Sequence, residues 1–418
     1  MLDNSNRKNY AAFNLPAGLF TSILKQVGCI IPSRSDMPIL ENVLFEFDTE
    51  RNAATFTGSN GDAVFCTAAP NGNTTDEGLD GLSFREIKAD GKLTDQLTPV
   101  CLPYRQLMSV LSVMPAGIQL HCVIDYDKQE FTVCYGSDSN VFTMSFEPAK
   151  EYPRIGAGET FNCRFKVSAK WLMPQIERAK ICIANDDLRP VMNNIYLDLQ
   201  TDHLALAASN SKILYTDRTF LGAGYCDQTG AETPRKGIFL HRSAVSLLPF
   251  PADDRDITIE ANDKFVRLSD DESVIILRQT EGNFPNYTAV IPRNQPHLAY
   301  FQRHTLIQAL RRVRTFVNPS TLLVKMEHKG DMVMLTGQDI DYNRALQEAV
   351  PYDGQCTLPE GFAIGFNVET LISVLEKCVT SDVILMRFVD GTKAVTIHSD
   401  DANDASVALV MPMMLSAE

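Results

Sequence analysis

The sequence has few of the features that mark membrane or secreted proteins. No apolar run approaches the ~20 residues that a membrane-spanning helix needs. The opening stretch, MLDNSNRKNY, holds no apolar core of a signal peptide. Ten cysteines are scattered through the 418 residues without a CxxC pair. This usage favours reduced, mostly buried thiols and a cytoplasmic location.

The motifs of common enzymes and metal sites are also missing. The sequence contains no HExxH, GxSxG, GxxxxGK[ST] or GxGxxG, and no two of its seven histidines stand at metal-ligand spacing on one element. Adjacent acidic pairs occur, but neighbouring residues in a loop usually both face water. Nothing near Cys29 in the sequence activates its thiol. We therefore expect no catalytic residue, no metal and no cofactor.

One enzyme class stays open as a rival interpretation. The acidic pairs Asp186-Asp187, Asp253-Asp254 and Asp270-Asp271 could serve a hydrolase that uses two carboxylates on a β-rich scaffold. A pocket with converging carboxylates of perturbed pKa would favour that reading.

Basic residues are outnumbered, and the net charge is −14. Taken alone, this balance argues against a nucleic-acid binder, since such proteins are usually basic. The average hides local sign, however, and basic residues gathered on one face could still meet a polyanion. The hydrophobic content of 44% lets each third of the chain bury its own core.

A strand unit recurs along the chain. At Pro190 the residues PVMNN lead into a run in which Ile195, Leu197 and Leu199 alternate with polar residues, as in a strand with one buried face. The same unit begins at Pro38 and, in weaker form, at Pro319. Recurrence at more than a hundred residues is not a solenoid repeat, so it indicates three domains of one fold.

Hydrophobic spacing predicts two helices in each of these domains. The expected helices cover residues 15–31, 104–114, 168–185, 241–248, 303–317 and 368–378. Asn367 is the expected N-cap of the last helix. Pro174 lies inside the third predicted helix, where a proline is expected to kink or restart it. The predicted domains are 1–156, 157–293 and 294–418, with polar surface insertions at about 70–96 and 222–237.

Together these residues resemble the bacterial DNA polymerase III beta subunit, the sliding clamp. The matching stretches occur in the family's order and are residues 34–42, 188–217, 281–287, 290–292, 364–368 and 410–415. The resemblance implies an α+β fold of three tandem DNA-clamp domains, each with two helices packed on antiparallel sheets. It also implies a head-to-tail homodimer closed into a ring.

The function implied by this resemblance is that of a processivity factor without catalytic activity of its own. Such a ring encircles double-stranded DNA without sequence specificity. It tethers the replicative polymerase, the clamp loader and repair proteins through short peptide motifs. The implied DNA-contacting residues, which would touch phosphates and not bases, are Lys25, Arg34, Arg105, Arg178, Lys180, Arg189, Arg242, Arg311 and Arg312.

The resemblance further implies a peptide-binding cleft near the end of the chain. Its walls, by matching, are Met192, Ser209, Ser211, Lys212, Leu214, Pro285, Val290, Asn367, Thr370, Thr392, Ala394, Leu409, Val410, Met411, Pro412, Met413 and Leu415. Three methionines and a leucine would form an odd exposed patch unless they pack or bind something, and methionine suits a pocket that accepts several ligands. The alternative is an edge strand packed on the core.

The chain departs from the family at several cleft positions. The family often has Gly-His at Ser211-Lys212, arginine at Ala289 and at Met414, and tyrosine at Thr370. We therefore expect a more apolar cleft with a shifted peptide preference. A third interpretation also stays open, in which a clamp-fold protein binds partners but does not encircle DNA.

Overall fold

The computed structural model describes residues 8–48, 53–69, 72, 74–75, 78–79, 81–94, 97–200, 202–220 and 237–415. Contacts divide the chain into two compact units. The first comprises Met1–Phe161, Leu247–Phe250 and Ile257–Arg278, and the second comprises Asn162–Ser246, Pro251–Asp256 and Gln279–Glu418. None of the helices in the described part of the chain has the length and apolar character of a membrane span.

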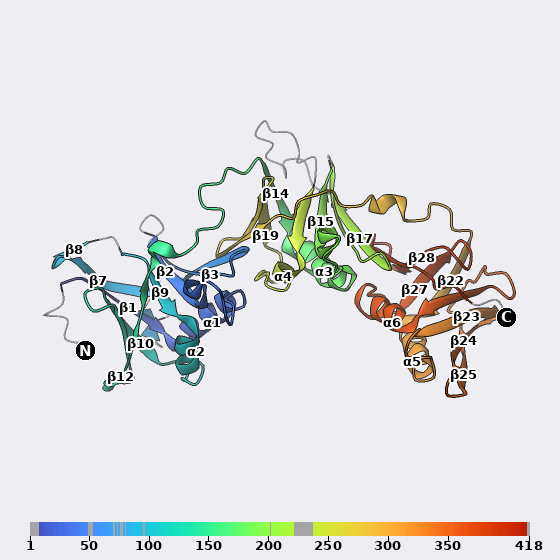
Figure 1. Ribbon diagram of the computed structural model, residues 1–418, viewed down its shortest axis with the longest axis horizontal. Coiled ribbons are helices and arrows are strands. Elements are labelled where there is room, and N and C mark those ends of the chain that lie inside the picture. Colours follow the sequence, from blue (N-terminus) through green and yellow to red (C-terminus); the bar gives the residue numbers. More distant parts are fainter. Residues whose placement is uncertain are drawn as a thin grey trace. The chain divides into compact units, whose positions relative to one another are not determined.

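The described part of the first unit holds two large antiparallel sheets, a two-stranded sheet of β5 and β6, and two helices (Figure 1). One sheet has the strand order β12-β11-β10-β1-β7-β8, and the other runs β13-β9-β2-β3-β4-β21-β20-β19 within this unit. The elements are β1 (Tyr10–Pro16), α1 (Ala17–Gly28), β2 (Asn42–Asp48), β3 (Ala53–Ser59), β4 (Ala63–Ala69), β5 (Thr74–Thr75), β6 (Gly78–Leu79), β7 (Ser83–Ala89), β8 (Lys92–Leu93), β9 (Val100–Pro103), α2 (Tyr104–Leu111), β10 (Gln119–Asp125), β11 (Glu130–Tyr135), β12 (Ser137–Ser145), β13 (Glu147–Pro148), β19 (Asp256–Ala261), β20 (Phe265–Ser269) and β21 (Ser273–Arg278).

Aromatic side chains fill the core of this unit. The ring centroids of Phe13 and Phe45 lie 5.1 Å apart, and those of Phe45 and Phe56 lie 4.9 Å apart. Helices α1 and α2 lie side by side (Figure 1) because Gly28 has no side chain at the point where the Tyr104 ring approaches. A Cβ atom at Gly28 would stand 1.8 Å from the Tyr104 hydroxyl, so only glycine allows this approach.

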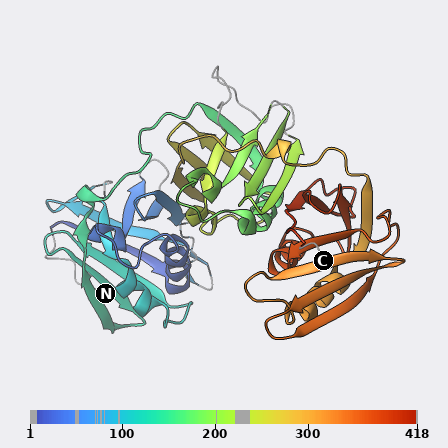
Figure 2. The same cartoon turned by 45° about the vertical axis from the view of Figure 1, so that its right-hand side comes forward.

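The second unit contains an eight-stranded sheet, a four-stranded sheet and four helices in its described part (Figure 2). The sheet orders are β18-β15-β16-β17-β29-β28-β27-β22 and β25-β24-β23-β26. The elements are β14 (Cys163–Ser168), α3 (Ala169–Ala179), β15 (Asn194–Leu199), β16 (His203–Ser209), β17 (Ile213–Phe220), β18 (Ile238–His241), α4 (Arg242–Val245), β22 (His297–Gln302), α5 (Arg303–Arg314), β23 (Leu323–Lys329), β24 (Met332–Asp339), β25 (Arg344–Pro351), β26 (Ala363–Asn367), α6 (Val368–Lys377), β27 (Val383–Phe388), β28 (Val395–Ser399) and β29 (Val407–Val410), with short 3-10 turns at Pro190–Asn193 and Tyr287–Ala289.

The order of elements recurs three times along the chain. A strand and a helix are followed by three strands, then by a strand and a second helix, then by three more strands. The series starts at β1, at β14 and at β22, and the first copy carries the additional strands β5 to β8 and β13. The mixed helix and antiparallel sheet architecture is thus the predicted one, while the division into three domains stays a prediction.

The predicted helices form, and each is shorter than its hydrophobic pattern suggested. Helix α5, for example, ends at Arg314 because its last turn continues as hydrogen-bonded turns at Thr315 and Phe316. Pro174 lies inside α3 without ending it, and a 3-10 turn at Lys180–Cys182 follows instead of further α-helix. Apolar periodicity therefore marks the buried face correctly but overruns the helix ends.

The predicted surface insertion at 70–96 differs from expectation. Residues 83–89 form β7, which pairs with β1 and extends the six-stranded sheet. Leu82 and Ile87 are buried, so two apolar side chains within a polar segment are enough to hold it against the core. The second predicted insertion, at 222–237, lies outside the described residues except for Gly237.

The caps of two helices provide a matched pair for mutation. The Asn367 side chain accepts a hydrogen bond from the Thr370 N–H at 3.0 Å, whereas Ser168, at the start of α3, makes no side-chain cap. We expect Asn367→Ala to lower the free energy of unfolding by about 1 kcal/mol and Ser168→Ala to leave it nearly unchanged. Urea denaturation of both variants measures this, and equal effects would contradict the role of the Asn367 cap.

Candidate functional site

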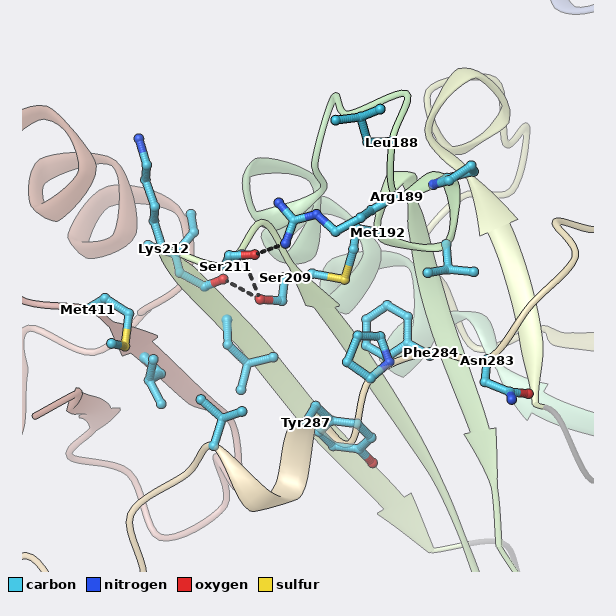
Figure 3. Close-up of a pocket in the computed structure, with 17 residues that line it drawn as sticks. Leu188, Arg189, Met192, Ser209, Ser211, Lys212, Asn283, Phe284, Tyr287 and Met411 are labelled. Atoms are coloured by element: carbon cyan, nitrogen blue, oxygen red, sulfur yellow. Dashed lines mark hydrogen bonds between the residues drawn. The ribbon is translucent and has the colours of Figure 1, made fainter.

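An apolar pocket of about 600 Å³ lies in the second unit (Figure 3). It opens over β16, β17 and β29, beside the linker that follows β21 and the end of the chain. Its lining residues are Leu188, Arg189, Pro190, Val191, Met192, Ser209, Ser211, Lys212, Ile213, Leu214, Asn283, Phe284, Pro285, Tyr287, Val290, Leu409 and Met411.

The turn between β16 and β17 forms the polar rim of this pocket. The Asn210 side chain accepts hydrogen bonds from the backbone N–H groups of Lys212 and Ile213, each at 3.0 Å. Ser211 takes a left-handed conformation with φ 73°. The tight turn presents the Ser211 hydroxyl to Arg189, whose guanidinium donates to it at 2.8 Å (Figure 3). Arg189 is also paired with Asp186 at 2.9 Å.

Two aromatic residues fix the linker against β15. The Phe284 ring stacks on Tyr196, with centroids 4.8 Å apart and an interplanar angle of 3°. The Tyr287 hydroxyl donates to the Asp198 carboxylate at 3.0 Å. Burial, followed by the Asp198 charge, raises the pKa of Tyr287, so this hydroxyl stays a neutral donor at physiological pH. The wall of the pocket is consequently held in place before any ligand arrives.

The floor of the pocket follows from strand register. Leu214 of β17 stands opposite Leu409 of β29, and Ala394 packs with both in a small apolar cluster. Tyr287 and Ile291 of the linker cover this cluster. Other apolar side chains at the pocket remain in water: Val290 is 51% exposed and Met411 is 39% exposed. Exposed apolar groups around a preformed hollow are suited to an apolar ligand.

The pocket brings together nine of the predicted cleft residues, namely Met192, Ser209, Ser211, Lys212, Leu214, Pro285, Val290, Leu409 and Met411. Of the others, Ala394 lies in the cluster under the pocket. Val410 is buried in the sheet between Ile213 and Val395. The remaining ones do not line it.

Those remaining residues have other contacts. Asn367 and Thr370 form the cap of α6, and the Thr392 hydroxyl donates to Asp390. The Met413 N–H donates to the Gly365 carbonyl at 2.8 Å, which draws the tail, Pro412 included, onto the edge of the four-stranded sheet. Leu415 lines a different hollow, over the same sheet.

Several lining residues were missed by the sequence interpretation as cleft residues. They are Leu188, Arg189, Pro190, Val191, Ile213, Asn283, Phe284 and Tyr287. All of them belong to the stretches that carry the family resemblance, and Ile213 directly follows the predicted Lys212. Proximity in sequence to the assigned residues was therefore the available signal. For Arg189 the resemblance implies DNA contact instead.

The ionisable side chains that line the pocket are Arg189, Lys212 and Tyr287. Among the described residues that line it there is no aspartate, glutamate, histidine or cysteine. None of the acidic pairs suggested for a hydrolase lines the pocket; Asp186 is paired with Arg189 at its rim, and Asp253 is paired with Arg255.

Most of the predicted DNA-contacting residues lie at the surface. Lys25, Arg34 and Arg242 are exposed. Arg105 is exposed as well, and its guanidinium donates to the Ser33 carbonyl. Lys180 is paired with Glu177. Exposure is what a phosphate contact requires, although it does not by itself identify one.

Arg178 is placed differently from the expectation. Its side chain is 18% exposed and forms an ion pair with Asp404 at 3.6 Å. It also donates to the Tyr215 hydroxyl at 3.3 Å. Tyr215 belongs to the neighbouring strand β17, and Asp404 lies in the segment before β29. The helical pattern of α3 alone could not reveal either contact. Arg178 is therefore absent from the DNA surface proposed below.

The repeated strand–helix units have the fold of solved sliding-clamp structures. The fold matches the DnaN sliding clamp of Pseudomonas aeruginosa bound to griselimycin with a TM-score of 0.80 and 20% identity, over 97% of this chain and 100% of that one. It matches the DNA polymerase sliding clamp of Bacillus subtilis with a TM-score of 0.82 and 16% identity, over the same shares.

Sequence comparisons lead to the same family. Residues 288–414 match the family described as DNA polymerase III beta subunit, C-terminal domain. The beta sliding clamp of Pseudomonas aeruginosa is 24% identical over 395 residues, which cover 94% of this chain and 96% of that protein. The beta sliding clamp of Caulobacter vibrioides is 21% identical over 401 residues, or 94% and 97%. The resemblance to the bacterial DNA polymerase III beta subunit is confirmed.

Proposed function

We propose that the chain is a processivity factor, a ring-shaped clamp that encircles duplex DNA and tethers a DNA polymerase through the apolar pocket. The observation that carries this proposal is the preformed pocket, whose lining residues lie in or next to the stretches that resemble the sliding-clamp family. Three of them, Val290, Leu409 and Met411, lie within the region that matches the family model. We assign it a binding role and no catalytic one. The replicative polymerase, the clamp loader and repair proteins are the partners we propose, with the cytoplasm as the location.

The pocket fits an extended peptide with apolar side chains. Its wall is fixed by Phe284 and Tyr287, while Met192 and Met411 supply adaptable contacts. Ser211 and Lys212 stand where the family often has Gly-His, and both are exposed at the rim. A tether for several partners needs this combination of a rigid wall and flexible side chains.

The proposed DNA contacts are cations at the surface, of which Lys180 is half-buried and the others are exposed, and they would meet phosphates. They are Lys25, Arg34, Arg105, Lys180, Arg242, Arg311 and Arg312, and Arg189 is reassigned to the pocket rim. Phosphate contacts hold a duplex without reading bases. A base-specific contact of ~1–3 kcal/mol would slow a protein that must slide. Retention would come from the closed ring.

Two sheet edges are suited to close that ring. Strand β12 lies at one end of the six-stranded sheet and β25 at one end of the four-stranded sheet. Each strand therefore has one edge without a partner strand among the described residues. We propose a head-to-tail homodimer of three-domain subunits in which β12 of each copy pairs with β25 of the other. Light scattering should give the mass of a dimer, and a strict monomer at micromolar concentration would overturn this assembly.

The pocket is tested by truncating two exposed side chains. The double substitution Val290→Ala and Met411→Ala is expected to weaken the binding of a polymerase-derived peptide about tenfold. The physical reason is that the apolar area which the two side chains bury against the peptide is together worth about 1.4 kcal/mol. Fluorescence anisotropy with the labelled peptide measures the affinity.

Met414→Ala is the matched control, since Met414 is 77% exposed and does not line the pocket. Its affinity should equal that of the wild type. The pocket assignment would be refuted if Met414→Ala lost affinity for the peptide, or if the double variant bound the peptide as tightly as the wild type. Retention on nicked circular DNA that ends on linearisation would separate an encircling clamp from a clamp-fold protein that only binds partners.

A further inference from the structure

A second hollow of about 430 Å³ lies next to the apolar pocket, and its character is cationic. We call it the cationic hollow; it is lined by Ile291, Pro292, Arg293, Asn294, Gln295, Arg387, Thr396 and His398. Val290 lines the apolar pocket and the next residue, Ile291, lines the cationic hollow. The same linker therefore borders both.

Strand register shows that the two hollows open on one face of the eight-stranded sheet. Leu214 stands opposite Leu409, Leu409 opposite Thr396, and Thr396 opposite Arg387. Residues directly opposite each other on neighbouring strands project to the same face. This row begins with two leucines beneath the apolar pocket and ends with a threonine and an arginine in the cationic hollow.

The polar groups of the cationic hollow are organised, and its positive charges are not neutralised by ion pairs. The Gln295 side chain donates to the Arg387 carbonyl at 3.0 Å and accepts from the Thr396 hydroxyl at 2.9 Å. The His398 ring lies 2.9 Å from the same hydroxyl. Among the described residues, no carboxylate forms an ion pair with the guanidinium of Arg293 or Arg387. In contrast, Arg178 has Asp404.

The charge of this hollow is set by the two arginines. Burial and then the charge of Arg387 lower the pKa of His398, while Asp404 opposes this shift. The imidazole is accordingly neutral at physiological pH. Register places both groups on one face of the sheet, because Arg387 stands opposite Thr396 and His398 lies two residues beyond Thr396 on β28. Two guanidinium groups that have no ion-pair partner among the described residues attract anions.

We propose that the cationic hollow binds an acidic side chain flanking the apolar motif of a peptide held in the apolar pocket. Carboxylates are the anions that a peptide carries, and the shared face places both hollows within reach of one chain. This inference rests on the proposed peptide-binding function and deepens it. It makes Arg293 and Arg387 specificity-determining residues.

Geometry sets the spacing of the acidic residue. Two strand spacings separate Leu409 from Arg387, or about 10 Å. An extended peptide advances about 3.3 Å per residue. The acidic residue should therefore lie about three residues from the apolar anchor. The direction in which the peptide runs across the strands decides whether the acidic residue precedes or follows the apolar motif.

The test compares two labelled synthetic peptides on the full-length protein. Both contain the polymerase-derived apolar segment. The acidic peptide carries an Asp-Asp pair three residues beyond each end of this segment, and the neutral peptide carries an Asn-Asn pair at the same positions. Fluorescence anisotropy should show that the wild type binds the acidic peptide about fivefold more tightly. In the double variant Arg293→Gln and Arg387→Gln this preference should vanish, while affinity for the neutral peptide is kept.

Arg218→Gln is the matched control, since Arg218 is an exposed arginine of β17 outside both hollows. It should keep the preference. Equal binding of the two peptides by the wild type would overturn this inference alone. No binding of either peptide would overturn the proposed peptide-binding function with it. If the double variant also lost affinity for the neutral peptide, the assignment of an acidic side chain to the cationic hollow would be overturned. If the double variant bound a short duplex more weakly but kept the preference for the acidic peptide, the cationic hollow would be a phosphate site and this inference would be overturned.

Discussion

Replacement of Asp404 by alanine is expected to lower the free energy of unfolding by about 3 kcal/mol, because it leaves the buried charge of Arg178 without its partner. The two side chains are 10% and 18% exposed and lie 3.6 Å apart. Tyr215 would remain as an uncharged acceptor for Arg178 at 3.3 Å. Removal of one member of a buried pair costs more than the pair contributes, since the other charge stays desolvated.

The matched control is Glu348→Gln. Glu348 is paired with Arg312, whose side chain is 57% exposed, so solvent screens that pair. Its loss should cost less than about 1 kcal/mol. Urea denaturation measures both variants. Equal losses in the two would show that the Arg178–Asp404 pair behaves as a surface pair.

The effect of Asp404 should depend on pH. Burial raises its pKa, but hydrogen bonds from Ser406 and Ser399 and the charge of Arg178 outweigh burial and lower it. A carboxylate whose pKa is lower in the folded state stabilises the fold above its unfolded pKa of about 3.9. That contribution is lost as the pH falls through the folded pKa. The stability difference between wild type and Asp404→Ala should therefore shrink below about pH 4.

Neutralising three glutamates around α5 is expected to tighten DNA association at low salt at least tenfold. Arg311 is paired with Glu376 at 2.7 Å, Arg314 with Glu369 at 2.6 Å, and Arg312 with Glu348 through two contacts of 3.0 Å. These arginines are 52% to 57% exposed. A phosphate that contacts them must displace a carboxylate. The triple variant Glu348→Gln, Glu369→Gln and Glu376→Gln removes that competition.

Salt dependence provides the measurement. Each phosphate contact contributes about 0.9 to the slope of log affinity against log salt. The triple variant should therefore steepen this slope by about two to three units. Anisotropy with a short labelled duplex over a series of salt concentrations determines it. The charge-matched variant Glu327→Gln, Asp331→Asn and Glu360→Gln, placed on the β23–β24 hairpin and the loop before β26, should bind like the wild type. Equal gains in DNA affinity in the two triple variants would show only the effect of net charge. No gain in either variant would show that α5 is not part of the DNA surface.

Local patterns in the sequence anticipated much of the architecture. The spacing of Leu306, Leu310 and Val313 identified the buried face of α5, and all three are buried. Asn367 was expected as an N-cap, and it caps α6. The recurring strand unit predicted the order of elements. Each of these features is encoded within a few consecutive turns or strands, where periodicity and capping chemistry act directly.

The sequence by itself determined the elements, their repetition and the stretches that border the apolar pocket. Tertiary structure alone decided that Arg178 is buried against Asp404, that α5 meets Glu348 of β25, and that Arg387 shares a face with Leu214. The physical reason is that these contacts join residues far apart in the chain. Strand register and packing set such contacts, and a one-residue shift in register would turn every side chain of a strand to the other face.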